Sequence, residues 1–122
     1  MMKFAEYLRL TESADAVQPK NLSELKKIIE DTIKEKGPNC DLNFIDVSKM
    51  TSLSYLFEKS NFNGDISKWD TSNVEDMFEM FKASEFNSDI SEWNVSNVNY
   101  MTSMFKGCPL EKKPAFQPKF NV

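Results

Sequence analysis

Three aspartates recur at one spacing and are the first candidates for chemistry in this chain. Asp41, Asp65 and Asp89 lie 24 residues apart. If successive units of that length stack, the carboxylates form a ladder that could collect Ca²⁺, which prefers oxygen ligands. The alternative is that each aspartate accepts a hydrogen bond from its own turn backbone, as in an Asx turn. With one carboxylate per unit and no glycine-rich calcium repeat, the Asx turn is favoured, and we predict no metal or other cofactor.

Two tryptophans and several methionines share this spacing. Trp69 and Trp93 lie 24 residues apart and could form a stacking platform for sugars or bases. The equivalent position in the preceding unit holds Ile45, which suits a buried position better than a platform. We therefore predict that both tryptophans belong to the core, and we expect the same of Met77, Met80, Met101 and Met104 rather than a soft-metal site.

Nucleophilic and acid–base chemistry has little support in the composition. The chain has no histidine, the residue that most often acts as a general base near neutral pH. Cys40 and Cys108 would lie about three rungs or ~14 Å apart in a stack, beyond the ~7 Å that a disulfide can span. We predict two unbridged thiols without a catalytic role, and a protein that is not an enzyme.

An internal repeat dominates the 122-residue sequence. Residues 62–85 and 86–109 align without a gap and share 13 of 24 positions, and residues 38–61 form a weaker copy. Such a unit cannot bury an apolar stripe alone, whereas stacked units can.

Each unit is expected to contain a short strand, a turn and a helix. Residues 65–70 lie between turn signals and predict the strand. Val74, Met77, Met80 and Phe81 fall at helical spacing, and Ser72 with Glu75 resembles a capping box. The predicted fold class is α/β: a short leucine-rich-repeat-like solenoid of about three 24-residue strand-turn-helix units, with an N-terminal capping helix.

The repeat resembles a known family. The segments WDTSNVEDMFEMF (residues 69–81) and WNVSNVNYMTSMF (93–105) are similar to the BspA-like leucine-rich repeats, in which W-D-x-S-N-V-x-x-M-x-x-M-F recurs. The resemblance implies a bacterial or phage-borne protein-binding repeat without catalysis. Many members of that family are exported surface adhesins.

The two ends are predicted to cap the stack. Residues 1–37 form a helical cap with a helix over 21–36, which begins at Asn21 and ends at Gly37, and a short helix over 3–10. Residues 38–109 form the three-repeat body. Residues 110–122 are expected to be extended, with Phe116 and Phe120 folded back over the last unit; a disordered tail is the alternative.

Surface residues that the repeat does not require are the candidates for binding a partner. The aromatic ones are Phe44, Tyr55, Phe78 and Tyr100, and the acidic ones are Glu75, Asp76, Glu79 and Glu92. The chain has a net charge of -4, and residues 37–110 hold 11 acidic and five basic side chains. Such a surface is suited to a partner with a basic surface rather than to nucleic acid itself. The alternative is that the acidic residues form an ordinary solvated surface and that the aromatic ones are isolated surface residues without a partner.

These features predict a monomeric, non-enzymatic protein-binding module. The narrower hypothesis is a cytoplasmic inhibitor, phage-borne and anti-CRISPR-like, that occupies the basic nucleic-acid channel of another protein. No secretory signal or membrane span is evident in the sequence. The alternative is a fragment of a surface adhesin that binds an extracellular host protein, and a third, weaker hypothesis is a metal-dependent enzyme.

Overall fold

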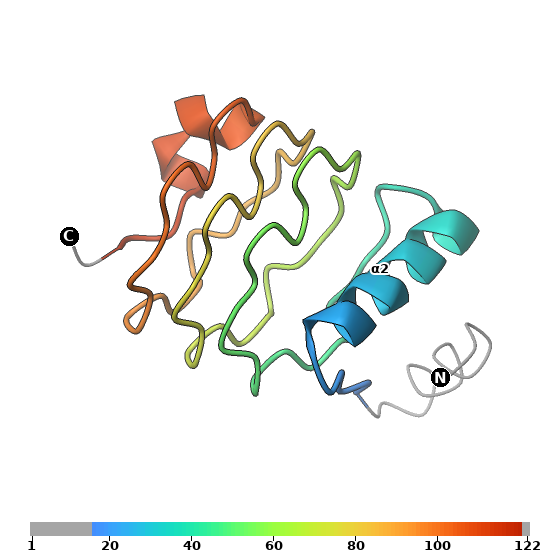
Figure 1. The fold of residues 1–122 in the computed structure, drawn as a ribbon. Helices are drawn as coiled ribbons and strands as arrows, with labels where there is room; N and C mark the ends of the chain where they lie inside the picture. The colour runs from blue at the N-terminus through green and yellow to red at the C-terminus, as the bar shows by residue number, and fades with distance from the viewer. Residues whose placement is uncertain (1–15, 121–122) are drawn as a thin grey trace.

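The computed structural model describes residues 16–120, and one α-helix lies at the N-terminal end of this part (Figure 1). This helix, α2, spans Leu22–Lys36. Two short 3₁₀ helices lie at the other end: η1 spans Pro109–Lys112 and η2 spans Pro114–Phe116. Among the described residues, no helix is both long and apolar enough to cross a membrane.

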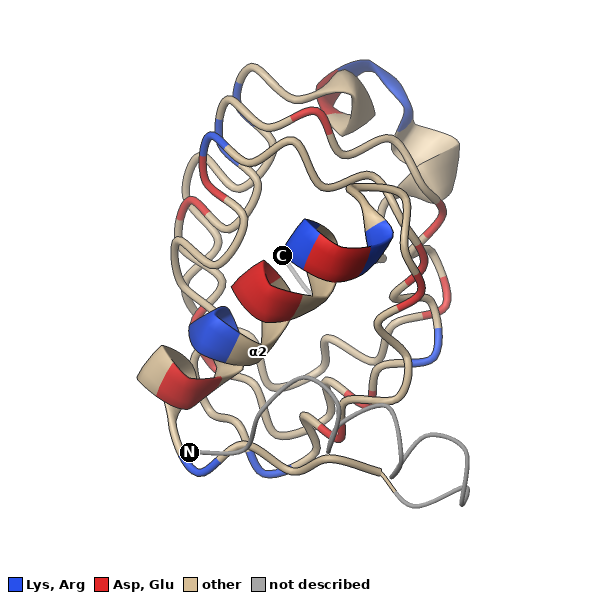
Figure 2. Cartoon of the chain, turned by 90° about the vertical axis from the view of Figure 1, so that its right-hand side faces the viewer, with Lys and Arg blue, Asp and Glu red and all other residues tan. Residues whose placement is uncertain are grey.

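The helix predicted over 21–36 is present, and the predicted signals determine both of its ends. The Asn21 side chain accepts a hydrogen bond from the Glu24 N–H at 2.8 Å. Gly37 ends the helix at φ 89°, with its N–H donating to Ile33 at 2.7 Å. The buried face includes Leu25, Ile28, Ile29 and Thr32. Figure 2 shows that α2 lies across the ring of the coils, where it covers one end of the core.

The chain between α2 and η1 winds into three stacked coils: coil 1 (residues 38–61), coil 2 (62–85) and coil 3 (86–108) (Figure 1). Isolated parallel bridges join residues 24 positions apart in neighbouring coils, pairing Asp41 with Asp65, Ser52 with Asp76, and Asp76 with Tyr100. We call the side formed by residues 50–60, 74–84 and 98–107 the front face, and the side formed by 38–48, 62–72 and 86–96 the back face.

The prediction of strand-turn-helix units is wrong. Within residues 16–120, α2 is the α-helix, and the coils contain isolated bridges rather than β-strands. Residues 74–81, predicted as a helix, contain the bridge residue Asp76 and turns from residue 78 onward, and residues 65–70 form no strand. The capping box is also absent, because the Ser72 hydroxyl donates to Asp70 at 2.6 Å instead.

Coil spacing gives the physical reason for this difference. Phe57, Phe81 and Phe105 stack with centroid distances of 5.5 and 5.8 Å, and Trp69 and Trp93 stack at 6.3 Å. Neighbouring α-helices need about 8–10 Å between their axes. Coils held this close on both sides leave no room for one helix per unit.

Backbone hydrogen bonds along the front face alternate between two kinds of acceptor. In coil 1, every second N–H donates to coil 2 over 2.8 to 3.0 Å: Leu53 to Asp76, Tyr55 to Phe78, Phe57 to Met80, and Lys59 to Lys82. The N–H groups of Leu56, Glu58 and Ser60 donate within the coil, to the carbonyl three residues before. Coil 2 repeats the pattern toward coil 3: Met77 to Tyr100, Glu79 to Thr102, Phe81 to Met104, and Ala83 to Lys106.

The back face brings backbones unusually close at Gly64. A Cβ at this position would lie 1.7 Å from the Cys40 carbonyl oxygen. The glycine is required because coil 2 passes directly over coil 1.

The C-terminal segment covers the back half of coil 3. Residues 109–112 and 114–116 form η1 and η2 rather than the extended chain predicted for this end. Phe116 and Phe120 do pack against the core, as expected. The Ile90 N–H donates to the Phe116 carbonyl at 3.0 Å, as the Leu42 N–H donates to the Asp65 carbonyl two coils earlier. The short helix predicted over 3–10 lies outside the described residues.

Candidate functional site

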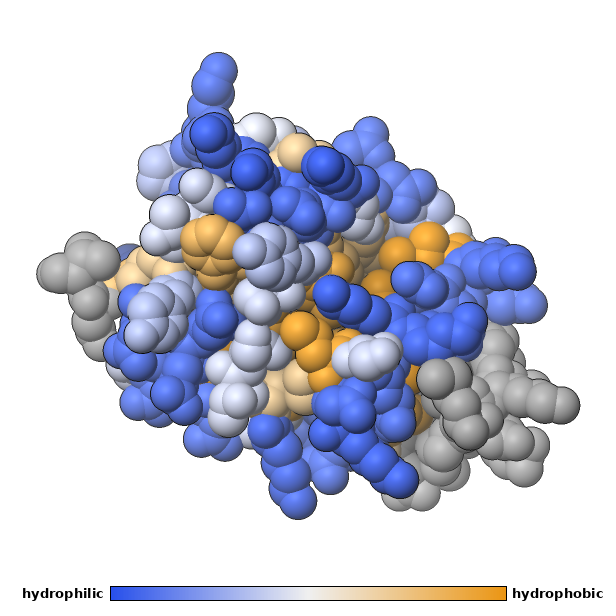
Figure 3. Space-filling view, viewed as in Figure 1, coloured by the Kyte–Doolittle hydropathy of each residue, from blue (hydrophilic) through white to orange (hydrophobic). Residues whose placement is uncertain are grey.

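The front face carries three of the four predicted aromatic residues. Tyr55 is 44% exposed and Tyr100 is 64% exposed, and these are the exposed large apolar side chains among the described residues. The half-buried ring of Phe78 contacts Tyr55 edge-on, with ring centroids 5.4 Å apart. The three residues belong to coils 1, 2 and 3 and step diagonally across the face. Figure 3 shows apolar residues reaching the surface at the centre of this side, surrounded by hydrophilic ones.

Three predicted acidic residues also belong to the front face, but they differ in accessibility. Glu75 is exposed. Asp76 is half-buried, and its carboxylate accepts from the Phe78 N–H at 2.9 Å. Glu79 forms an ion pair with Lys82 at 3.3 Å, and its side chain is only 16% exposed. Glu75 is therefore the carboxylate best placed to meet a partner.

The remaining two predicted residues lie on the back face. Phe44 is half-buried against the core, and its carbonyl accepts from the Val17 N–H at 3.0 Å. Glu92 is exposed and occupies the equivalent position in coil 3. The structure therefore divides the predicted set between two sides, and Phe44 and Glu92 do not join the site around Tyr55 and Tyr100.

The aspartate ladder consists of Asx turns. Asp41 accepts from the Asn43 N–H at 2.7 Å, and Asp89 accepts from the Ser91 N–H at 2.8 Å. Asp65 accepts from both the N–H and the hydroxyl of Ser67, and these hydrogen bonds lower the pKa of its carboxyl group. Among residues 16–120, no group of three or more metal-ligating side chains is close enough to hold an ion.

Tryptophan and cysteine side chains are part of the core. Trp69 and Trp93 are 4% and 5% exposed, and their indole N–H groups donate to carbonyls of the preceding coil. Cys40 and Cys108 are buried and unbridged, as predicted. Burial raises the pKa of the Cys40 thiol, which opposes formation of the reactive thiolate.

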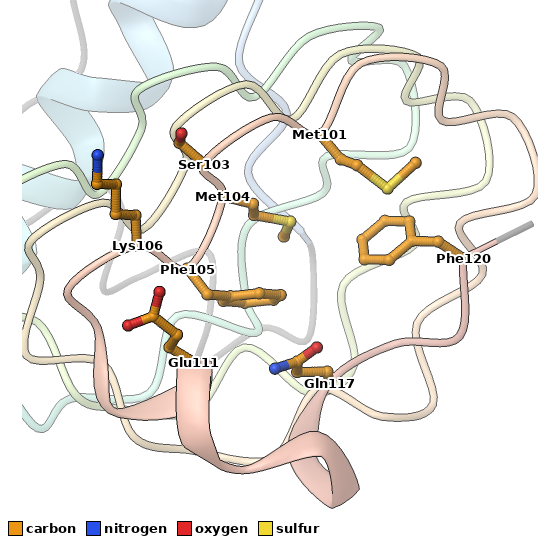
Figure 4. Close-up of a pocket in the computed structure, with 8 residues that line it drawn as sticks. All are labelled: Met101, Ser103, Met104, Phe105, Lys106, Glu111, Gln117 and Phe120. Carbon is orange, nitrogen blue, oxygen red and sulfur yellow. The ribbon is translucent and has the colours of Figure 1, made fainter. Parts of the chain in front are cut away.

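A pocket at the open end of coil 3 was not predicted from the sequence. It has a volume of about 460 Å³ and is lined by Met101, Ser103, Met104, Phe105, Lys106, Glu111, Gln117 and Phe120. In Figure 4 the Phe120 ring points into the pocket below Met101, and Glu111 lies near Lys106. The only sequence signal for this pocket was the run of prolines after residue 108, which turns the chain back over the last coil.

Comparison with known proteins identifies the family but gives no activity. No curated protein and no solved structure matches the chain. The family described as "Mycoplasma protein of unknown function, DUF285" matches residues 20–117, which include α2, the three coils and both 3₁₀ helices. The resemblance to BspA-like repeats stays a prediction. The chain belongs to the DUF285 family of Mycoplasma proteins of unknown function.

Proposed function

We propose that this chain is a protein-binding module whose front face docks on a basic surface of another protein. The observation that carries the proposal is the exposure of Tyr55 and Tyr100 on one face. These residues belong to coils 1 and 3, and coil 2, which lies between these coils, contributes the exposed carboxylate of Glu75. The proposal assigns no reaction to the chain.

Tyrosines suit this role because they combine a large apolar ring with a polar end. Such residues are enriched among the few that dominate binding energy at interfaces. Tyr55 is held by the ring of Phe78 and by its N–H, which donates to the Phe78 carbonyl at 3.0 Å. The backbone of Tyr100 is likewise bonded to coil 2 through the Met77 and Glu75 backbones. Side chains fixed on a rigid backbone lose less entropy on binding.

Charge supplies the second part of the proposal. Residues 37–110 carry 11 acidic and five basic side chains, so the coils are the acidic part of the chain. A negative surface accelerates encounter with a positive one, and the attraction weakens as salt screens it.

The proposal is tested by affinity capture with one aromatic variant, one charge variant and a matched charge control. The immobilised chain is incubated with lysate of cells that carry its gene, and retained proteins are identified by mass spectrometry. Tyr100→Ala and Glu75→Lys should each lower retention of the same protein by about tenfold, because an anchor residue at an interface contributes about 1.4 kcal/mol or more. Retention should also fall as NaCl is raised.

The matched control is Glu92→Lys, which makes the same charge change at an exposed position on the back face. It should bind as wild type does. Equal losses for Glu75→Lys and Glu92→Lys, or retention that is insensitive to salt, would contradict docking through the front face. If the partner is a nucleic-acid enzyme, its nucleic acid should compete with the chain, which would support the inhibitor hypothesis. A partner found only in extracellular material would support the adhesin alternative.

A further inference from the structure

The front half of coil 3 ends in a row of four equivalent backbone donors, three of which have no acceptor among residues 16–120. In coils 1 and 2, every second N–H on this side donates to the next coil. The equivalent groups in coil 3 are the N–H groups of Met101, Ser103, Phe105 and Gly107. Within residues 16–120, the first three of these form no hydrogen bond. An aligned row of unpaired backbone donors is a template for an added chain segment whose carbonyls match its spacing.

The fourth donor shows which kind of acceptor the row can bind. The Gly107 N–H donates to a carboxylate oxygen of Glu111 at 3.4 Å, so a side-chain oxygen takes the place that a carbonyl of the next coil takes in coils 1 and 2. On the back face, the Phe116 carbonyl fills the corresponding place for Ile90. Residues 109–120 thus cover the back half of coil 3 and leave most of the front row uncovered by the part of the chain that the structure describes.

Beside this row lies the pocket shown in Figure 4. Met101, Met104, Phe105 and Phe120 provide its apolar walls, and Lys106 lies at its edge. Residues 106–120 hold four lysines and one glutamate, a net charge of +3, whereas the coils are acidic. The end of coil 3 therefore offers backbone donors, an apolar hollow and positive charge together.

A second copy of the chain is a poor fit for this end. The complementary carbonyls belong to coil 1, but α2 lies across that end of the stack, with Leu25, Ile28 and Ile29 buried there (Figure 2). A helix with its side chains is about 10 Å across, so it would hold another molecule's coil away from hydrogen-bonding distance. A single segment that winds like residues 74–84 has no such obstacle.

We propose that the front half of coil 3 binds a segment of another protein, with acidic residues and apolar side chains, that adopts the turns of residues 74–84 and whose carbonyls accept from Met101, Ser103 and Phe105. This site is separate from the one under the proposed function and does not depend on it. Coil 2 supplies the pattern of such a segment: residues 74–84 present four carbonyls to coil 1, bury Met77, Met80 and Phe81, and carry three acidic residues and one lysine.

The test uses a synthetic peptide with the sequence of residues 74–84, VEDMFEMFKAS, titrated into the full chain and followed by NMR. In the free chain, the Met101, Ser103 and Phe105 amide hydrogens should exchange rapidly with solvent, while those of Glu79 and Phe81 are protected. Saturating peptide should slow exchange at the first three amides by about tenfold or more and leave the Glu79 and Phe81 amides unchanged. A scrambled peptide of the same composition should bind at least about tenfold more weakly.

Two variants separate the pocket from the rest of the surface. Phe120→Ala removes an apolar wall, and Lys106→Glu reverses the charge at the edge; each should weaken peptide binding by about tenfold. Lys68→Glu makes the same charge change at an exposed back-face position and should leave affinity within about twofold. Protected Glu79 and Phe81 amides in each variant show that the stack is intact.

Three outcomes overturn the proposal. The first is the absence of saturable peptide binding. The second is binding that leaves the Met101, Ser103 and Phe105 amides unprotected. The third is a concentration-dependent dimer, measured by light scattering, in which these amides are protected without peptide, because that result assigns the end to a second copy.

Discussion

Short polar side chains fix the corners of the coils. Asp46, Asp70 and Asn94 occupy equivalent positions, and each accepts from the N–H of the serine two residues later at 2.9 to 3.0 Å. Ser72 adds a hydroxyl bond to Asp70 at 2.6 Å. These bonds satisfy backbone donors at turns that have no helix or strand to satisfy them. Because they favour the charged carboxylate, the Ser72 hydroxyl and N–H lower the pKa of Asp70, and Ser48 does the same for Asp46.

The lowered pKa values predict that the chain loses stability in acid. A carboxyl group whose pKa is lower in the folded state stabilises the fold above its unfolded pKa of about 3.9, and this contribution is lost as the pH falls through the folded pKa. Asp70→Asn should keep the turn, because Asn94 accepts the same hydrogen bond in coil 3. Because asparagine does not titrate, the free energy of unfolding should decline less steeply below about pH 4 in this variant. Urea denaturation from about pH 2.5 to 7 measures this. Ser72→Ala removes one donor and so raises the folded pKa of Asp70 toward its unfolded value; it should make the decline smaller and end it at a higher pH. An unchanged pH profile in Asp70→Asn would refute this interpretation.

At the scale of the element, the front-face turns depend on left-handed residues. Two positions per coil, four residues apart, have φ between 50° and 75°: Tyr55 and Lys59, Glu79 and Ala83, Ser103 and Gly107. This conformation costs an L-residue roughly 1 kcal/mol, a cost that glycine avoids. The sequence uses glycine at only one of the six positions, so hydrogen bonds between coils must outweigh the strain at the other five.

At these left-handed positions glycine should therefore stabilise the fold at least as well as alanine, the reverse of the order seen at most positions. Ala83 and Gly107 allow the exchange to be made in both directions. Ala83→Gly should leave the free energy of unfolding unchanged or raise it by up to about 1 kcal/mol, and Gly107→Ala should lower it by about 1 kcal/mol. The added Cβ at Gly107 would lie 3.5 Å from the Ala83 Cα, so the loss comes from backbone strain rather than from a clash. Urea denaturation measures both. Ala115→Gly, at a residue without positive φ, is the control and should not stabilise; a loss of 1 kcal/mol or more in Ala83→Gly would contradict the argument.

At the scale of the whole molecule, stacked aromatic rings join the coils into one core. Phe81 is fully buried, with Phe57 on one side at 5.5 Å and Phe105 on the other at 5.8 Å. It also stacks on Phe86 at 4.5 Å. Phe105, at the open end, is 9% exposed. Closure of one end by α2 and partial closure of the other by the C-terminal segment keep this core from water.

Truncation along this stack should be most costly in the middle. Phe81→Ala should lower the free energy of unfolding by about 3–5 kcal/mol, because it leaves a cavity among three rings, and Phe105→Ala should cost clearly less. Denaturant unfolding followed by tryptophan fluorescence measures both. If Phe81→Ala does not fold, Phe81→Leu and Phe105→Leu provide the same comparison. Equal losses at the two positions would show that the end of coil 3 is as tightly packed as the middle.

The sequence by itself determined the 24-residue period, the two ends of α2 and the Asx turns, because each depends on residues close together in the chain. It did not determine whether residues 74–81 form a helix. Val74, Met77, Met80 and Phe81 are buried as the pattern required, but that spacing also suits a row of turns. The choice depends on carbonyls of the next coil, 23 residues away, which accept every second N–H and which only the stacked chain brings within reach. The same tertiary contacts placed Phe44 and Glu92 away from the front face and left the donor row of coil 3 open, since the spacing of residues along the chain does not show which backbone groups find a partner.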